Sequence, residues 1–268
     1  MPREFKQVDV FTTEPYRGNP VAVVLDAQDL STEQMQRFAH WTNLSETTFV
    51  LPSDQGDYRV RIFTPVAELP FAGHPTLGTC HAWLEAGGIP AGDDAIQECG
   101  AGLVRVRRGE HLAFAAPPLI RSGPVDEADR QHAADVLNIE SAEIVDAAWA
   151  DNGPGWMAVL LRDADAVLAL KPGFVDFDLG VVGAREDGWE LRAFFPKDGS
   201  TVEDPVTGSL NASVAQWLLE SGRARAPYVA HQGTALGRAG RVHVSQDPDG
   251  TVWVGGGTVT CVEGRVRL

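Results

Sequence analysis

Short β-rich runs broken by turn residues dominate the first part of the chain. They are rich in Val, Ile, Phe and Thr, which predicts strands, and they lie at 8–11, 21–25, 48–51 and 58–63. Between the second and third runs, residues 31–42 begin with a Ser-x-x-Gln capping signal and carry Met35, Phe38 and Ala39 at helical spacing. The pattern predicts a sheet-rich fold with few helices.

Two segments of small residues predict helices of a different kind. The first starts after His74, with Pro75 suited to its first turn, and ends at Gly87 and Gly88. The second covers about 208–221 and ends at Gly222. Because small residues allow close packing, we expect each helix to be buried inside a closely wrapped sheet.

These two helices belong to a repeat. Residues 63–84 and 195–218 both start from Phe near Pro, pass a turn, reach Gly73 or Gly208, and run through small residues to Trp-Leu. The copies lie about half the chain apart, far beyond the period of a solenoid. Weaker echoes at the same separation relate the runs ending at Asp26 and Asp163, and the strands around Val104 and Val242. Alternating strands can resemble one another by chance, but three echoes at one separation favour two similar domains.

Length and charge agree with this division. A chain of 268 residues is near the size at which single cores stop growing. Pro and Gly at 115–124 predict a linker, so we expect domains at 1–118 and 119–268, with a helix at 127–137. The net charge of −15 argues against nucleic-acid and anionic-membrane partners.

Several classes of protein are excluded by what the sequence lacks. The N-terminus has no apolar run of a signal peptide, and no stretch of 18 apolar residues occurs, so we expect a cytoplasmic location. The three cysteines are too few and too irregularly spaced for a disulfide framework or zinc site and are interpreted as packing residues. The histidines show no metal-binding spacing, and Gly255–Gly257 lacks the continuation of a dinucleotide loop. We therefore expect no metal and no cofactor.

The starts of the two small-residue helices are the candidate ligand sites. A helix that begins at a Gly-rich turn presents unpaired N–H groups, which suit a carboxylate. For either helix start alone, the alternative to a binding role is that its glycines serve only the geometry of the turn. The paired occurrence of the sites, with His74 beside one and Asp204 beside the other, favours a binding role.

Four segments resemble the PhzF family of phenazine-biosynthesis-like proteins. They are R-G-N-P-V-A-V at 17–23, N-L-S-E-T-T-F-V at 43–50, F-A-G-H-P-T-L-G-T at 71–79 and E-D-P-V-T-G-S-L-N-A at 203–212. The resemblance covers nearly the whole chain in the family's order. It implies the α+β fold of diaminopimelate epimerase: two similar domains related by pseudo-twofold symmetry, each a β-barrel-like sheet around a central helix, with the active site in the cleft between them. It also implies a homodimer.

The resemblance assigns roles to individual residues. Glu46 matches the family's catalytic glutamate, and His74 and Asp204 match its other polar active-site positions. A carboxyl between apolar strands has a raised proton affinity, which suits a group that acts as base and then acid; without the resemblance, an exposed or capping Glu is the alternative. The expected substrate-binding residues are Ser45, Gly73, Pro75, Thr76, Thr207, Gly208 and Ser209, although Ser209 also suits a helix cap.

The function implied is a cofactor-independent isomerase, in which Glu46 moves a proton between carbons of a small unsaturated or cyclic acid such as trans-2,3-dihydro-3-hydroxyanthranilate. Two-cysteine racemisation, used elsewhere in the superfamily, is disfavoured because segments 72–76 and 204–209 contain no Cys. The alternative is a noncatalytic dimeric protein that binds small carboxylates in the same cleft. Candidates for selecting the substrate lie on two loops and are Tyr16, Arg17, Asn152 and Trp156.

Overall fold

The computed structural model describes residues 1–268 and divides into two compact units. Unit 1 comprises Met1–Ala115 and Gly255–Leu268, and unit 2 comprises Ala116–Val254. The first boundary falls within the predicted linker. The expected second domain, 119–268, differs from unit 2 at its end, because the last strand pairs with the first strand of unit 1.

Unit 1 contains two helices and most of the strands of the first half of the chain. Its elements are β1 (Pro2–Val10), β2 (Asn19–Val24), α1 (Thr32–Thr42), β3 (Glu46–Leu51), β4 (Tyr58–Phe63), β5 (Glu68–Leu69), α2 (Gly73–Glu85), β6 (Ala95–Cys99), β7 (Gly102–Arg108), β8 (Leu112–Ala115) and β18 (Thr258–Arg267). The strands pair in the order β18, β1, β2, β3, β4, β6, β7, β8, with parallel pairing at β2–β3 and β4–β6.

Unit 2 has a similar succession with one additional α-helix and two short 3-10 helices, labelled η. Its elements are β9 (Arg121–Pro124), α3 (Glu127–Leu137), η1 (Ser141–Glu143), β10 (Ile144–Asp151), β11 (Met157–Leu161), α4 (Ala164–Ala169), β12 (Leu179–Arg185), β13 (Gly188–Lys197), β14 (Ser200–Asp204), α5 (Gly208–Glu220), β15 (Tyr228–Gln232), η2 (Thr234–Leu236) and β16 (Gly240–Gln246). The chain returns to unit 1 within β17 (Val252–Gly256).

The strand pairing confirms the repeat found in the sequence. In unit 2 the order is β9, β10, β11, β12, β13, β15, β16, and the parallel pairs are β11–β12 and β13–β15. Each parallel pair therefore has a counterpart in unit 1. The predicted echo segments occupy matching strands, β2 with β11 and β7 with β16.

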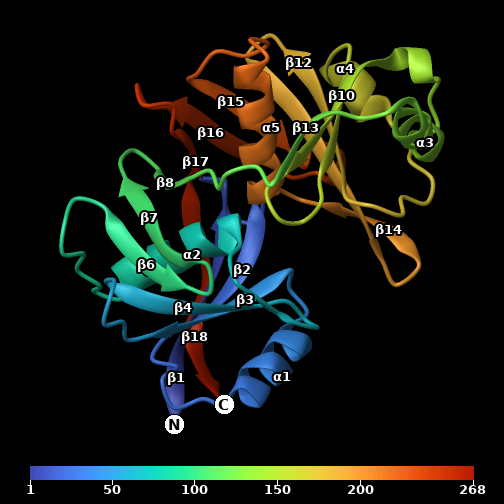
Figure 1. Cartoon of the computed structure of the whole chain (residues 1–268). Helices are drawn as coiled ribbons and strands as arrows, with labels where there is room; N and C mark the ends of the chain where they lie inside the picture. The colour runs from blue at the N-terminus through green and yellow to red at the C-terminus, as the bar shows by residue number, and fades with distance from the viewer. The chain divides into compact units, whose positions relative to one another are not determined.

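A buried helix lies among the strands of each unit, α2 in unit 1 and α5 in unit 2 (Figure 1). Helix α2 contacts strands on several sides, including β1, β2, β3 and β8. The absence of a side chain at Gly78 allows this approach, because a Cβ there would lie 2.3 Å from Val21 Cγ1. The predicted burial of both small-residue helices is confirmed.

The remaining helices follow their local signals. Helix α1 begins at Ser31 with the predicted capping box, and Met35, Phe38 and Ala39 face a core that includes Phe49 and Phe63. Helix α3 covers the predicted 127–137 and packs into the separate core of unit 2.

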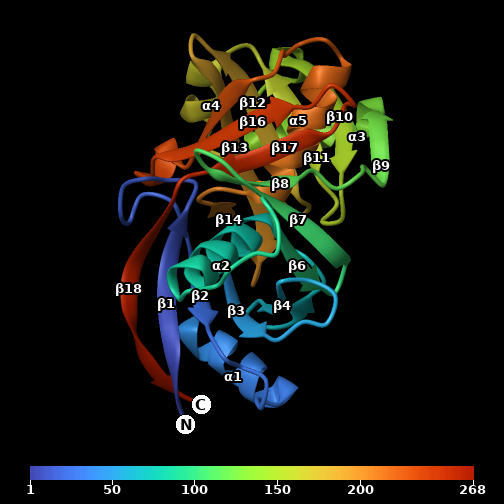
Figure 2. The same ribbon diagram turned by 90° about the vertical axis from the view of Figure 1, so that its left-hand side faces the viewer.

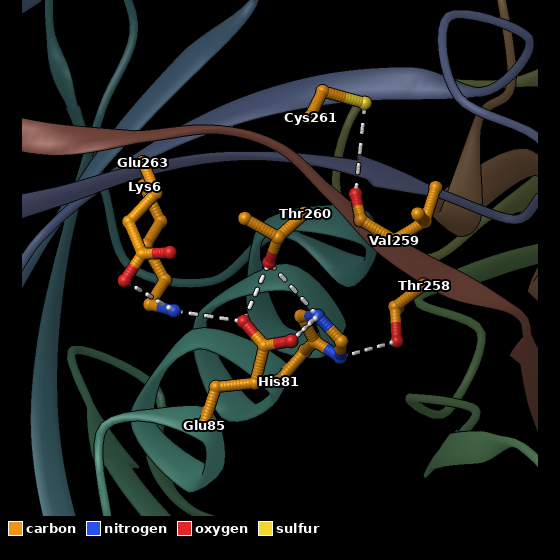
Figure 3. Close-up of polar contacts among 8 residues, drawn as sticks. All are labelled: Lys6, His81, Glu85, Thr258, Val259, Thr260, Cys261 and Glu263. Carbon is orange, nitrogen blue, oxygen red and sulfur yellow. Dashed lines mark hydrogen bonds and ion pairs between the residues drawn. The ribbon is translucent and has the colours of Figure 1, made fainter.

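The last strand is fixed both to the first strand and to α2. Strands β18 and β1 run side by side (Figure 2), pairing from Pro2 with Arg267 to Val10 with Thr258. Polar side chains then join both strands to α2 (Figure 3). The contacts are Lys6 Nζ to Glu85 Oε2 at 2.9 Å, Thr260 Oγ1 to Glu85 Oε2 at 2.6 Å, and His81 Nδ1 to Thr258 Oγ1 at 2.9 Å. The C-terminal segment is thus part of the framework that holds α2.

Candidate active site

Glu46 is the first residue of β3 and lies beside Val21 in the parallel pair of β2 and β3. The preceding Ser45 is exposed, whereas the Glu46 side chain is only 15% exposed. The buried strand residues that follow, Thr47 to Val50, anchor the position of Glu46. The carboxyl is therefore held at the start of a buried strand.

His74 brings an imidazole to this carboxyl. It is the second residue of α2, its side chain is 6% exposed, and its Nε2 lies 3.3 Å from Glu46 Oε2. Two residues predicted from separate motifs are thus in contact within unit 1.

The imidazole of His74 is neutral. Burial lowers the pKa of His74 to about 3, against a smaller opposing effect of its hydrogen bond with the backbone of Pro20. The carbonyl oxygen is the acceptor there, since proline has no N–H. Nε2 has no hydrogen-bond partner, so the ring donates through Nδ1 and leaves Nε2 as an acceptor that faces Glu46. A protonated Glu46 can donate to this nitrogen.

The start of α2 adds backbone donors next to this pair. Ala72 is the N-cap and provides no side-chain cap, while the N–H of Thr76 is already bonded to the Ala72 carbonyl. Pro75 has no N–H, which leaves the amides of Gly73 and His74 at the positive, N-terminal end of the helix dipole. These amides can donate hydrogen bonds to an anionic group.

Thr76 is buried, as its neighbours Gly73 and Pro75 are. It is completely buried, and its hydroxyl accepts a hydrogen bond from Gln97 Nε2 at 2.9 Å. Gln97 in turn accepts one from the Tyr58 hydroxyl at 3.2 Å. Thr76 thereby links the first turn of α2 to the neighbouring strands.

In unit 2, Asp204 ends β14 and lies opposite Ala193 of β13. The preceding Glu203 is bound by Arg192 through two hydrogen bonds of 3.0 and 2.7 Å. Arg192 also donates to the carbonyls of Val167 and Leu170, near the end of α4. Glu203, the first acidic residue of the E-D-P segment, is therefore structural, and its ion pair fixes the backbone that carries Asp204.

Asp204 is also bound from the start of α5. The hydroxyl of Thr207, the N-cap residue, donates to Asp204 Oδ2 at 2.5 Å. The buried Gln232 contacts both residues, with its Nε2 donating to the Asp204 carbonyl at 3.1 Å and to Thr207 Oγ1 at 2.9 Å. Gly208 follows as the first, buried residue of the helix.

Ser209 is bound by two residues of the loop between β10 and β11. Trp156 Nε1 donates to Ser209 Oγ at 3.0 Å, and Asn152 Nδ2 donates to the Ser209 carbonyl at 2.9 Å. Because an indole N–H can only donate, the Ser209 hydroxyl proton is left for another acceptor. The sequence named Asn152 and Trp156 only as loop candidates; their contact with Ser209 is a finding of the structure.

No thiol takes part in either helix start. Cys80 is fully buried on α2, and burial raises the pKa of its thiol to about 11. Burial also raises the pKa of Cys99, and Cys261 is half-buried on β18. The structure contains no group of three or more His, Cys, Asp or Glu residues that could hold a metal ion. None of its helices has the length and apolar character needed to cross a bilayer.

The family model described as phenazine biosynthesis-like protein matches residues 8–264. The chain belongs to the PhzF family. It is 35% identical over 280 residues to trans-2,3-dihydro-3-hydroxyanthranilate isomerase of Pseudomonas aeruginosa, covering 97% of this chain and 98% of the relative. It is 37% identical over 289 residues to antisense-enhancing sequence 1 of Schizosaccharomyces pombe, covering 97% of both.

Solved structures of the PhzF family share the fold. The Bacillus anthracis phenazine biosynthesis protein of the PhzF family superposes with a TM-score of 0.85 at 24% identity, with complete coverage of both chains. A hydroxyproline epimerase of Agrobacterium vitis superposes with a TM-score of 0.59 at 12% identity, over 99% of this chain and 92% of that one. The predicted epimerase-like α+β fold is confirmed. Membership of the PhzF family also places this protein among the isomerases.

Proposed function

We propose that this PhzF-family isomerase moves a proton between two carbons of a small unsaturated or cyclic acid, of the type of trans-2,3-dihydro-3-hydroxyanthranilate. The observation that carries the proposal is the contact of Glu46 with a neutral His74 in a largely buried setting. The similarity to the P. aeruginosa isomerase supports the choice of substrate class.

Glu46 is the proposed acid and base. Its carboxylate removes a proton from a saturated carbon, and the electrons of that C–H bond form a new double bond. The π electrons of the original double bond then form the C–H bond at the carbon that is protonated. The same carboxyl then delivers a proton there, so no oxidant and no co-reactant are needed. The composition of the substrate is unchanged, as an isomerisation requires.

His74 serves this cycle by staying neutral. An imidazolium beside Glu46 would hold the carboxyl in its ionised form and oppose the half of the cycle in which it carries the proton. The neutral Nε2 can instead accept a hydrogen bond from the protonated carboxyl. We propose this as the role of His74.

The other predicted residues are proposed to bind the substrate. The amides at the starts of α2 and α5, with the Ser209 hydroxyl, suit a carboxylate, and the net charge of −15 makes such local donors necessary. Asp204, held by Thr207, suits an amino or hydroxyl group. The homodimer implied by the family resemblance stays a prediction, to be tested by sedimentation velocity.

The test is NMR in D2O with trans-2,3-dihydro-3-hydroxyanthranilate and related small acids. We expect deuterium at a carbon of the product with the wild type and a rate at least about 1,000-fold lower with Glu46→Gln. Glu4→Gln is the matched control, because Glu4 is an exposed residue of β1 and the change removes the same charge. Absence of exchange across the acids, with equal binding by the wild type and Glu46→Gln, would instead identify a noncatalytic carboxylate-binding protein.

A further inference from the structure

Gln232 makes four hydrogen bonds that together fix its orientation. Its Nε2 donates to the Asp204 carbonyl and to Thr207 Oγ1, at 3.1 and 2.9 Å. Its Oε1 accepts from the Thr207 N–H at 3.0 Å and from Asn211 Nδ2 at 2.8 Å. A backbone N–H can only donate and a carbonyl can only accept, so the amide cannot be reversed. Gln232 is completely buried and uses both donors and its acceptor oxygen at the start of α5.

This orientation determines where the Thr207 proton points. Because Thr207 Oγ1 accepts a hydrogen bond from Gln232, its own proton is directed to Asp204 Oδ2 at 2.5 Å. The chain of donors therefore runs in one direction, from Gln232 through Thr207 to Asp204. This chain holds Asp204 Oδ2 as a hydrogen-bond acceptor. Because a carboxylate is planar, the direction of Oδ1 is then fixed as well.

Unit 1 contains an equivalent glutamine. Gln97 and Gln232 are separated by the same offset as Thr76 and Asn211. In each unit the glutamine bonds the fourth residue of the buried helix, with Gln97 Nε2 donating to Thr76 Oγ1 at 2.9 Å and Asn211 Nδ2 donating to Gln232 Oε1 at 2.8 Å. Both glutamines are completely buried. The repeat thus preserves a contact as well as a fold.

We propose that Gln232 is a positioning residue for Asp204, which acts through Thr207, and that Gln97 holds the start of α2 in the same way through Thr76. Neither glutamine has a role in the proton transfer itself. The inference rests on the proposed function where it concerns catalysis, and on the hydrogen bonds alone where it concerns the position of the Asp204 carboxylate. A displacement of about 1 Å of a binding group can lower a rate about 100-fold.

The test compares four variants with the wild type. Thr207→Val removes the hydroxyl at nearly constant volume, Thr207→Ser keeps it, and Gln232→Met removes the amide. Gln216→Met is the matched control for the loss of an amide, since Gln216 lies on α5, the helix that Thr207 caps, and bonds only the Pro117 carbonyl through its amide nitrogen. With trans-2,3-dihydro-3-hydroxyanthranilate as the probe, we expect Gln232→Met and Thr207→Val to lower kcat/KM about 10- to 100-fold and Gln216→Met to lower it less than 2-fold. Thr207→Ser should recover at least 5-fold relative to Thr207→Val.

A crystal structure of Gln232→Met provides the readout that is independent of turnover. We expect the Asp204 carboxylate to leave its position against Thr207 Oγ1, with the rest of unit 2 unchanged. If the carboxylate keeps that position, or if wild-type kinetics persist in Gln232→Met, the positioning role is overturned and the isomerase proposal stands. If the wild type itself shows no turnover, the proposed function fails and the crystal structure alone decides the positioning role.

Discussion

Arg192 binds Glu203 through two hydrogen bonds while both side chains are nearly buried, at 8% and 11% exposure. The equivalent place in unit 1 is taken by Arg61, which binds Glu68 through its Nε and Nη2 at 2.7 and 2.6 Å. Each pair lies just before the Pro-containing turn that leads to the buried helix. The ion pair is therefore part of the repeated unit, and it sets the position of the turn.

Removing Arg192 is expected to destabilise unit 2. In Arg192→Met the Glu203 carboxylate remains largely buried without its partner, and the Val167 and Leu170 carbonyls lose their donor. We expect the free energy of unfolding in urea to fall by about 3 kcal/mol. Arg162→Met is the control, because Arg162 is 79% exposed and forms only a surface pair with Asp163; an equal loss in both variants would contradict the buried-pair argument.

The buried neutral His74 makes stability depend on pH. Its pKa is lowered from 6.5 to about 3, so the unfolded chain binds the additional proton between these values. The stability that the neutral ring contributes is complete above pH 6.5 and is lost as pH falls toward 3, by about 1.4 kcal/mol per pH unit.

The measurement is urea unfolding at pH 7.0 and 5.0 for the wild type and His74→Gln. We expect the difference between the two pH values to be smaller in the variant. Burial also lowers the pKa of His231, to about 4. His231→Gln should therefore also reduce the difference in the free energy of unfolding between the two pH values. An unchanged pH dependence in His74→Gln would contradict the buried neutral state.

The cysteines are expected to differ in reactivity. Cys80 is buried with a pKa of about 11, and Cys99 is buried with a raised pKa, whereas Cys261 is partly accessible. At pH 8 a chromogenic disulfide should label one thiol per native chain rapidly, and Cys261→Ser should abolish that phase. The labelled protein should keep its activity. If labelling abolished activity, and if bound substrate prevented that loss, a thiol-dependent mechanism would be supported.

Thr260 joins β18 to α2 and can be tested without altering charge. Its hydroxyl donates to Glu85 and lies 3.1 Å from His81 Nε2. Thr260→Val should lower the free energy of unfolding by about 1 to 2 kcal/mol, because two polar groups lose a partner. Thr234→Val, at an exposed position in unit 2, is the control and should leave the urea midpoint unchanged.

The sequence predicted the elements whose signals are local. The capping box at Ser31, the apolar spacing of α1 and the small residues of α2 and α5 all act within a few turns, and the structure has helices there. Glu46 and His74 were each singled out by their motifs, but their contact is a finding of the structure, because no motif sets the distance between them. Gln97 and Gln232 were missed because a single glutamine in a strand has no periodic signal. Only the offset that they share with Thr76 and Asn211 could have indicated them.

The expected division at 1–118 and 119–268 did not include the return of the C-terminus to unit 1, because pairing between residues 2–10 and 258–267 depends on contacts across the whole chain. The alternation of apolar and polar residues within either strand does not indicate which strand it pairs with. Side chains of both strands also contact His81 and Glu85 of α2, far from either strand in the sequence.

The pairing of β1 with β18 also sets the order in which the protein can be completed during synthesis. Unit 2 is one continuous stretch, Ala116–Val254, and is translated between the two segments of unit 1. Strand β18, one of the two strands beside β1, is therefore made only after the whole of unit 2. The half of the protein that carries Glu46 and His74 cannot complete its sheet until the other half has been synthesised.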